Sequence, residues 1–182
     1  MPKPRAFFGL ISLCLICSSV LVAADTSTQT KTWTFEKQQF AIDTPAGWEN
    51  IPSDNSIVVL RLKPDITPVP GQFSDVFVIT VTPLSDAADQ ATLNQYASGA
   101  MKGNGKGKAD VKVSDAQDCT IAGEPAKKYT VEKKLNGLDT TATYVIAHRA
   151  HNLYVFLYMT SPARVDEGQK NLDTVLKSVK WQ

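Results

Sequence analysis

His148 and His151 are the only histidines of the chain, and imidazole is a common side chain in acid–base catalysis and metal binding. A zinc site would need further His, Cys or carboxylate ligands nearby, and no neighbouring residue has a spacing that supplies them. His148 falls at the end of an expected strand and His151 in the turn that follows. We therefore expect a solvated pair and no metal site.

Cys119 is a candidate nucleophile or redox sensor, and either role requires a thiolate stabilised by a nearby cation or base. Its sequence neighbours are Asp118 and Thr120, and an adjacent carboxylate raises the pKa of a thiol. We expect Cys119 to be a small buried hydrophobic residue. In an oxidising compartment, pairing between two chains is the alternative.

The glycine-rich segment 103–107 is a weak candidate for a phosphate-binding loop. It lacks the P-loop spacing and follows an expected helix, whereas a phosphate loop connects a strand to a helix. The acidic residues Asp54, Asp65, Asp75 and Asp86 have no spacing that indicates acid–base catalysis. No nucleophile elbow occurs either. The sequence thus predicts no catalytic residues, no cofactor and no enzymatic activity.

Lysines are frequent between residues 102 and 134. Lys106, Lys108, Lys127 and Lys128 form a candidate basic face for an anionic partner or for lipid headgroups. Acidic residues are interspersed among them, which favours the alternative of a solvated edge with weak surface ion pairs.

The first 24 residues have the pattern of a secretory signal peptide. Lys3 and Arg5 give a positive start, residues 6–22 are mostly apolar, and small residues precede a cleavage site after Ala24. Cleavage removes two of the 19 Lys and Arg residues, leaving 17 against 18 Asp and Glu residues. This balance does not support a nucleic-acid-binding protein.

We expect a periplasmic or secreted protein, with residues 25–31 as a flexible tether and residues 32–182 as a single domain. The alternative is an uncleaved leader that anchors the chain in the membrane, because the apolar run is nearly long enough to span a bilayer. Cys14 follows Leu13 and Cys17 follows Ile16, so neither has the small preceding residue that a lipid-modified cysteine needs.

The end of the chain indicates a layered domain. Residues 153–159 are apolar at consecutive positions, and a strand with one wet face would alternate, so we expect both faces of this strand to be buried. Ser161 and Pro162 suit the start of a helix that continues to Trp181. Its apolar stripe comprises Val165, Leu172, Val175, Leu176 and Val179. Residues 76–81 predict another central strand.

Asn136-Gly137 predicts a two-residue hairpin that places Tyr129 opposite Tyr144 and Val131 opposite Ala142. The other face of this hairpin carries lysines and threonines, including Thr141 and Thr143, and we expect it to be solvated at an exposed edge strand. A second hairpin is expected at residues 149–152.

An earlier helix is predicted from Thr92, which stands three residues before Gln95 in capping-box spacing, to Gly103. Its expected buried residues are Leu93, Tyr96, Ala97, Ala100 and Met101. Residues 63–75 form a long loop with three prolines, and long loops in compact domains are often functional. The candidate partner-contact residues there are Ile66, Pro68, Val69, Pro70 and Phe73.

Several short segments resemble the PsbP-like family of alpha/beta/alpha sandwiches, which includes DcrB-like envelope proteins. They are residues 40–48, residues 92–96, the hairpin at 144–159 and the closing helix at 172–181. The resemblance implies an α+β fold with a central antiparallel sheet of about six or seven strands and helices on both faces. It also implies non-enzymatic accessory roles. No metal ligand of PsbP has a match in this sequence.

We therefore expect an accessory or interaction module of an envelope or membrane-associated assembly, monomeric and bound to a protein partner. A small-ligand or metal-binding carrier, with a pocket between sheet and helix, is the alternative.

Overall fold

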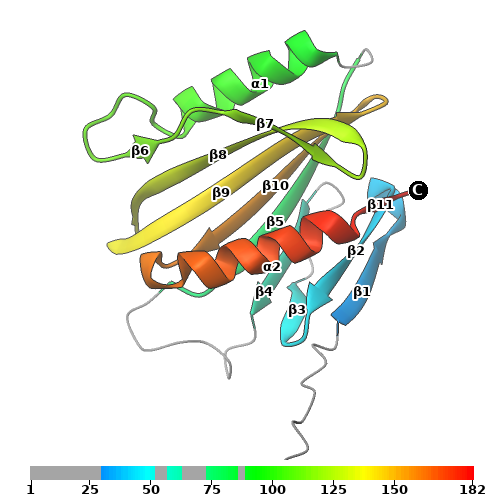
Figure 1. Ribbon diagram of the computed structural model, residues 1–182, viewed down its shortest axis with the longest axis horizontal. Helices are drawn as coiled ribbons and strands as arrows, with labels where there is room; N and C mark the ends of the chain where they lie inside the picture. The colour runs from blue at the N-terminus through cyan, green and yellow to red at the C-terminus, as the bar shows by residue number, and fades with distance from the viewer. Residues whose placement is uncertain (1–29, 52–56, 63–72, 86–88) are drawn as a thin grey trace, which may run out of the picture.

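The computed structural model describes residues 30–51, 57–62, 73–85 and 89–182. Within them the chain forms an eight-stranded sheet, a three-stranded sheet and two α-helices (Figure 1). The large sheet has the order β3-β4-β5-β10-β9-β8-β6, with β7 also paired to β8. Its strands are β3 (Trp48–Ile51), β4 (Ile57–Leu62), β5 (Val76–Pro83), β6 (Lys112–Val113), β7 (Gln117–Ile121), β8 (Glu124–Leu135), β9 (Leu138–Arg149) and β10 (Asn152–Thr160). All these strand pairs are antiparallel.

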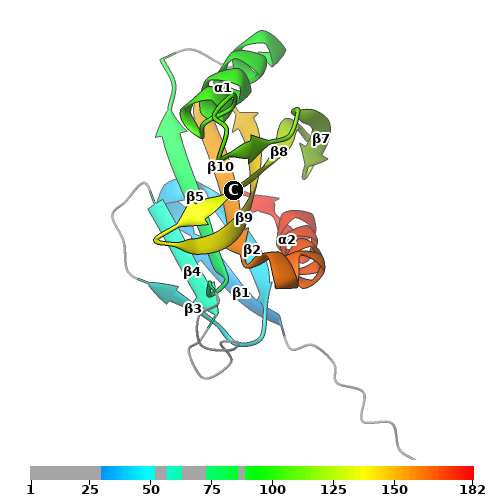
Figure 2. The ribbon, with the colours of Figure 1, turned by 90° about the vertical axis from the view of Figure 1, so that its left-hand side faces the viewer.

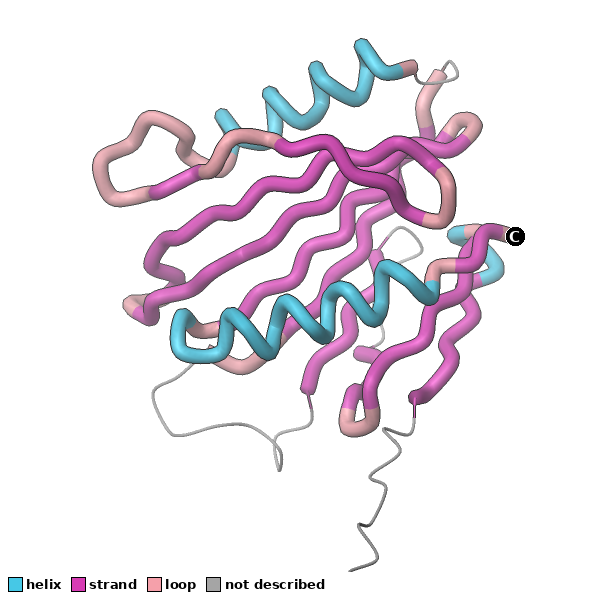
Figure 3. The backbone as a smooth tube through the Cα atoms, in the orientation of Figure 1, coloured by secondary structure: helices cyan, strands magenta, loops and turns pink. Residues whose placement is uncertain are grey.

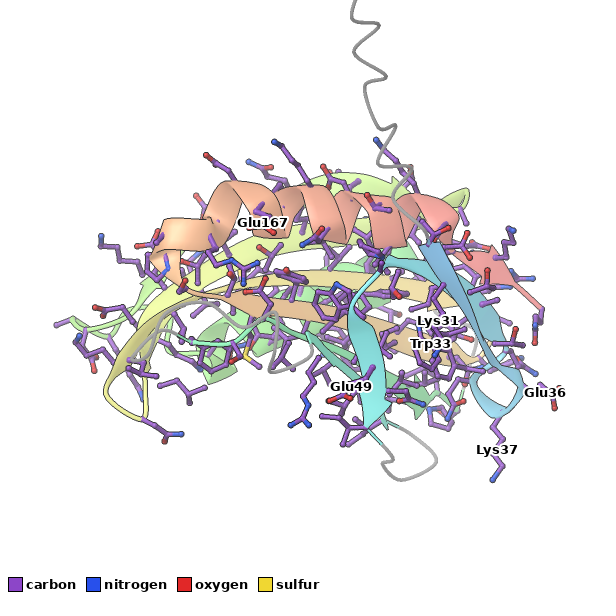
Figure 4. The ribbon with its side chains drawn as sticks, turned by 90° about the horizontal axis from the view of Figure 1, so that it is seen from below. Lys31, Trp33, Glu36, Lys37, Glu49 and Glu167 are labelled. Carbon is purple, nitrogen blue, oxygen red and sulfur yellow. The ribbon has the colours of Figure 1, made fainter. Side chains whose placement is uncertain are left out.

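The three-stranded sheet has the order β1-β2-β11 and lies beside the end of the second helix (Figure 3). It contains β1 (Thr30–Phe35), β2 (Phe40–Pro45) and β11 (Lys180–Trp181), and a 3-10 turn, Glu36–Gln38, joins the first two. Figure 4 shows Lys31 and Trp33 together on β1, where the Lys31 Nζ atom is 3.7 Å from the centroid of the indole. The central antiparallel sheet is present as expected but has eight strands rather than about six or seven, and a second sheet forms because β2 pairs with β1 and β11.

The first helix, α1 (Gln90–Gly103), begins earlier than predicted. Asp89 is its N-cap, and the Thr92 amide donates a hydrogen bond of 2.7 Å to the Asp89 carboxylate, so Thr92 lies inside the first turn. Leu93, Ala97 and Met101 are buried as expected. Tyr96 is 40% exposed, which contradicts the prediction that it packs in the core.

The second helix, α2 (Val165–Ser178), follows a 3-10 turn, Pro162–Arg164, that has proline in its first turn. The helix ends at Ser178 rather than near Trp181, because the chain turns into β11 to pair with β2. Leu172 and Val175 are buried in the predicted stripe, whereas Val165 at the start of the helix is 36% exposed.

The hairpin register predicted from Asn136-Gly137 is confirmed. Tyr129 pairs with Tyr144 and Val131 pairs with Ala142 across β8 and β9. The second hairpin also turns where expected, with Asn152 opposite Arg149.

The predicted surroundings of the first hairpin were wrong in two respects. Strand β8 is not an edge, since β6 and β7 both pair with it. Thr141 and Thr143 are buried rather than solvated, because the 3-10 turn before α2 contacts β9.

Alternate residues of β10 enter two separate apolar clusters. Tyr154, Phe156 and Tyr158 belong to a cluster with Leu172 and Val175 of α2. Leu153 belongs to a second cluster with Leu93, Ala97 and Met101 of α1. Successive side chains of a strand point to opposite faces, so the clusters lie on opposite faces of the large sheet. In Figures 1 and 2, α1 lies at the top of the view near β8, and α2 lies lower, beside β2.

The two faces differ in burial, and here the expectation from the continuous apolar runs was only half right. On the α2 side the apolar side chains are buried, and we call this the closed face: Val58, Leu60, Phe77, Ile79, Val145, Ala147, Tyr154, Phe156 and Tyr158. On the α1 side, the apolar side chains around the cluster of Leu93, Ala97 and Met101 are only half-buried, and we call this the open face: Ile57, Val59, Val76, Val78, Tyr144, Val155, Leu157 and Met159.

Candidate functional site

A groove of about 650 Å³ lies between α1 and the open face of the large sheet. Its helical wall uses a stripe of α1 that adjoins the buried one, and its floor comes from β9 and β10. The lining residues are Thr92, Gln95, Tyr96, Gly99, Ala100, Ile146, Leu153 and Val155. This volume is within the usual range for small-molecule sites, roughly 300–1,000 Å³.

The helix α1 builds this groove because it covers only part of the sheet. Its buried stripe, Leu93, Ala97 and Met101, packs on β8 and β9. Tyr96 and Gly99 fall on the neighbouring stripe, where they face solvent over β10 instead. A Cβ atom added to Gly99 would meet no heavy atom within 4 Å, so this part of the helical wall is open.

The floor of the groove continues across the open face. Val155 is opposite Ile146 on β9 and opposite Thr80 on β5. Two residues further along β10, on the same face, Leu157 is opposite Tyr144 on β9 and Val78 on β5. These registers place half-buried apolar side chains side by side over several strands. Such extended apolar surfaces, left partly uncovered, are typical of binding sites in soluble proteins.

Among the residues that the structure describes, no charged side chain lines the groove. Its side-chain hydrogen-bonding groups belong to Thr92, Gln95 and Tyr96 on α1. The Thr92 hydroxyl already donates to the Asp89 carboxylate at 2.7 Å. Gln95 and Tyr96 line the groove and are exposed, so their side chains are accessible to a ligand there. The arrangement suits binding of an uncharged, mainly apolar group, and it offers no acid–base or nucleophilic pair.

One end of α1 is fixed by two stacked tyrosines. The rings of Tyr129 and Tyr144 are parallel, with centroids 4.9 Å apart. The Tyr144 hydroxyl donates to the Asn104 side-chain oxygen at 2.8 Å, and the Asn104 amide donates to the Tyr129 hydroxyl at 3.2 Å. Burial raises the pKa of both phenols. Because Asn104 also caps α1, this cluster holds the helix at its position above the sheet.

The closed face contains a buried ionic cluster that the sequence did not reveal. Asp75, which is fully buried, accepts hydrogen bonds from the Tyr158 hydroxyl at 2.9 Å and the Thr160 hydroxyl at 2.7 Å. The Arg164 guanidinium lies 3.1 Å from the same carboxylate. Burial raises the pKa of Tyr158 well above its usual range. The cluster ties β5, β10 and the start of α2 together, and it is enclosed rather than open to a ligand.

Of the predicted contact-loop residues, Ile66, Pro68, Val69 and Pro70 lie outside the described part of the chain. Phe73 is described and is half-buried.

The four lysines of the candidate basic face do not project as one group. Lys106 pairs with Asp115 at 2.7 Å, and Lys127 pairs with Asp118 at 2.6 Å. Lys127 and Lys128 are consecutive on β8, so their side chains point to opposite faces.

The histidines and the cysteine that were considered for catalysis or metal binding do not form a common site. His148 is on β9 opposite Leu153, and His151 is exposed in the following turn. Cys119 is half-buried on β7, and burial, together with the nearby Asp118, raises its pKa despite the opposing effect of Lys128. Among the described residues no group of three or more His, Cys, Asp or Glu side chains is arranged to hold a metal ion.

A second cavity, of about 660 Å³, lies between the segment before β6 and the β8–β9 hairpin. Two of its lysines are already paired, Lys112 with Glu132 and Lys134 with Asp139. Its charges are therefore largely balanced within the chain, and it is the weaker candidate.

Comparison with solved structures defines the fold. The chain superimposes on cyanobacterial PsbP (CyanoP) from Synechocystis with a TM-score of 0.61 and 15% identity, covering 99% of this chain and 100% of that one. LpqN, described as involved in cell envelope biogenesis of Mycobacterium tuberculosis, gives a TM-score of 0.62 at 12% identity, covering 85% and 86%. A structure from Bacteroides thetaiotaomicron gives 0.55 at 13% identity over 85% of this chain, which spans about half (49%) of that longer protein.

The chain thus has the PsbP-like fold, as its short sequence segments indicated. At these identities the similarity establishes the fold alone. No protein-family model matches the sequence, and comparison with curated proteins gives no match. No helix among the described residues has the length and apolar character needed to cross a membrane.

Proposed function

We propose that this chain is an extracytoplasmic, non-enzymatic interaction module of the cell envelope, and that it binds its target in the groove beside α1. The observation that carries the proposal is the difference between the sheet faces. The apolar side chains of the closed face are buried, whereas those of the open face are only half-buried beside an uncharged groove. Leaving apolar area in water lowers stability by roughly 25 cal/mol per Å², so function is the simplest reason to keep it.

The location rests on residues 1–24, which have the signal-peptide pattern. Cleavage after Ala24 would release a chain that contains every described element. The fold shared with CyanoP and with LpqN, an envelope-biogenesis protein, supports an accessory role. In the proposed architecture α1 and α2 complete a sandwich with one helix on each face of the large sheet, and a single monomeric domain covers residues 32–182.

Site-specific photo-crosslinking in the host tests this proposal without assuming what the target is. A photoreactive amino acid replaces the exposed Tyr96 in the groove, and in a control chain it replaces Lys170, which is exposed on α2. After irradiation of intact cells, we expect an adduct of defined mass from the Tyr96 position and none from the Lys170 position. A protein adduct would identify an accessory partner.

Equal labelling at the two positions, or none at either, would contradict the groove as the binding site. In that case the loop at residues 63–75 is the next candidate contact, and replacing residues 66–70 by a short Gly-Ser link would test it.

A further inference from the structure

We propose that the occupant of the groove beside α1 is the acyl chain of a single lipid molecule. This inference rests on the binding role proposed above and specifies its ligand. Three properties of the groove point to this chemistry: its lack of charge, its length and volume, and the pairing of the backbone around it.

The lining of the groove is uncharged. None of its eight described residues carries a charged side chain. Placing an ionised group of a ligand in such a lining would remove its hydration without providing a counter-ion. The groove is therefore complementary to an uncharged chain, while the exposed Gln95 amide and Tyr96 hydroxyl in its lining can bond an uncharged or zwitterionic headgroup.

The dimensions suit a hydrocarbon chain. From Thr92 to Ala100 the helical wall is about 12 Å long at 1.5 Å per residue. The groove holds about 650 Å³, which is ample for a hydrocarbon chain of that length.

The backbone argues against an extended peptide. Both strands of the floor are interior: β9 is paired with β8 and β10, and β10 is paired with β9 and β5. The amides and carbonyls of α1 are used within the helix. A peptide strand lying in the groove would therefore bury unpaired N–H and C=O groups, and each such group costs about as much as a lost hydrogen bond. A hydrocarbon chain has no such groups.

An acyl-chain site has a quantitative signature. Burying one methylene is worth about 0.8 kcal/mol, which corresponds to a roughly fourfold gain in affinity. Affinity for a series of uncharged chains should rise by about this factor per methylene until the groove is filled and then stay constant.

The experiment is a titration of ¹⁵N-labelled chain, residues 25–182, with the linear alcohols from 1-hexanol to 1-dodecanol, followed by amide NMR. We expect shifts confined to α1, β9 and β10, and the fourfold gain followed by a plateau. The Gly99→Leu variant places a side chain in the open wall and should weaken binding at least tenfold. Gly103→Leu is the matched control, because it makes the same change in open space on the same helix outside the groove.

The acyl-chain site would be refuted if the alcohols caused no saturable shifts. It would also be refuted if their affinity did not change with chain length, or did not fall in the Gly99→Leu variant. A protein adduct at Tyr96 without alcohol binding would retain the proposed function and refute this ligand. Dimers that dissociate on Gly99→Leu would assign the groove to a second copy. Binding to phosphatidylcholine vesicles without saturable alcohol binding would assign it to a membrane surface; either result refutes the inference.

Discussion

The closed and open faces of the large sheet use similar residues in different ways. On the closed face, Phe77, Phe156 and Tyr158 are buried in a cluster with Leu172 of α2 and Phe40 of β2, and Asp75 and Arg164 form an enclosed ion pair at one end. On the open face, Val155 and Leu157 stand beside a helix that covers only part of the sheet. In the proposed function, the closed face stabilises the fold and the open face remains accessible for binding.

Removal of the buried carboxylate should have the largest effect on stability. Asp75→Ala leaves Arg164, whose side chain is 14% exposed, paired with Glu167 at the surface but without its buried partner, and leaves two hydroxyl donors without an acceptor. Breaking a buried pair from one side typically costs about 3–5 kcal/mol. Urea unfolding of the variant should show a loss of this order.

Asp139→Ala is the control for Asp75→Ala. It removes an ion pair with Lys134 in which both side chains are 67% exposed. Exposed pairs are worth about 0–1 kcal/mol, so its unfolding midpoint should barely move. Similar losses in both variants would show that the closed face has no special role in stability.

A methyl group on α2 tests how tightly the closed face is packed. A Cβ atom at Gly168 would lie 2.7 Å from the Tyr158 ring and 3.2 Å from a Thr160 methyl. Both neighbours belong to the Asp75 cluster, so they cannot move without disturbing its hydrogen bonds. Gly168→Ala should therefore destabilise the protein by about 1–3 kcal/mol, the usual range for overpacking. Unchanged thermal unfolding would contradict the dense packing inferred here.

High pH should destabilise the protein through its buried tyrosines. Burial raises the pKa of Tyr158 and of Tyr129 in the folded chain, whereas both phenols ionise near pH 10 when unfolded. The stability they contribute is therefore complete below about pH 10 and is lost as pH rises above it, by about 1.4 kcal/mol per pH unit for each group. Unfolding measured from pH 8 to 11 should show this decline, and Tyr158→Phe should reduce its slope. An unchanged slope in that variant would contradict the assignment.

The smallest expected change has the opposite sign and lies in α1. Gly99→Ala adds a methyl group in open space within a helix, where replacing glycine by alanine stabilises by about 0.5–1 kcal/mol. Calorimetry should show a slightly raised melting temperature. We therefore expect the same glycine-to-alanine substitution to raise stability in α1 and to lower it in α2. Changes of stability in the same direction would remove the distinction between the faces.

Local patterns predicted much of this fold. The Asn136-Gly137 turn gave the register of β8 and β9, because a two-residue hairpin fixes which residues are opposite each other. The apolar run at residues 76–81 likewise predicted β5, which lies between β4 and β10 in the sheet. The PsbP-like fold was recognised from the arrangement of such segments.

The groove and the ionic cluster could not be predicted from the sequence, because both depend on contacts between residues that are distant along the chain. The apolar run of β10 predicted burial on both faces, but the length of a run does not say how far a neighbouring helix extends over the sheet. Tyr96 was placed in the core because it adjoins the stripe of Leu93 and Ala97, yet α1 is rotated so that it faces the groove. Asp75 and Arg164 are 89 positions apart, and only the pairing of β5 with β10 brings them together.

The most direct test of the account is the reactivity of single thiols on the two faces. In residues 25–182 with Cys119→Ser, Val155→Cys places a single thiol on the open face and Ala147→Cys places one on the closed face, where Ala147 is fully buried. A thiol reagent under native conditions should label the thiol at position 155 rapidly and the thiol at position 147 only as fast as the whole domain unfolds. Saturating 1-decanol should slow the first reaction and leave the second unchanged. Equal protection of the two thiols would contradict an open binding face.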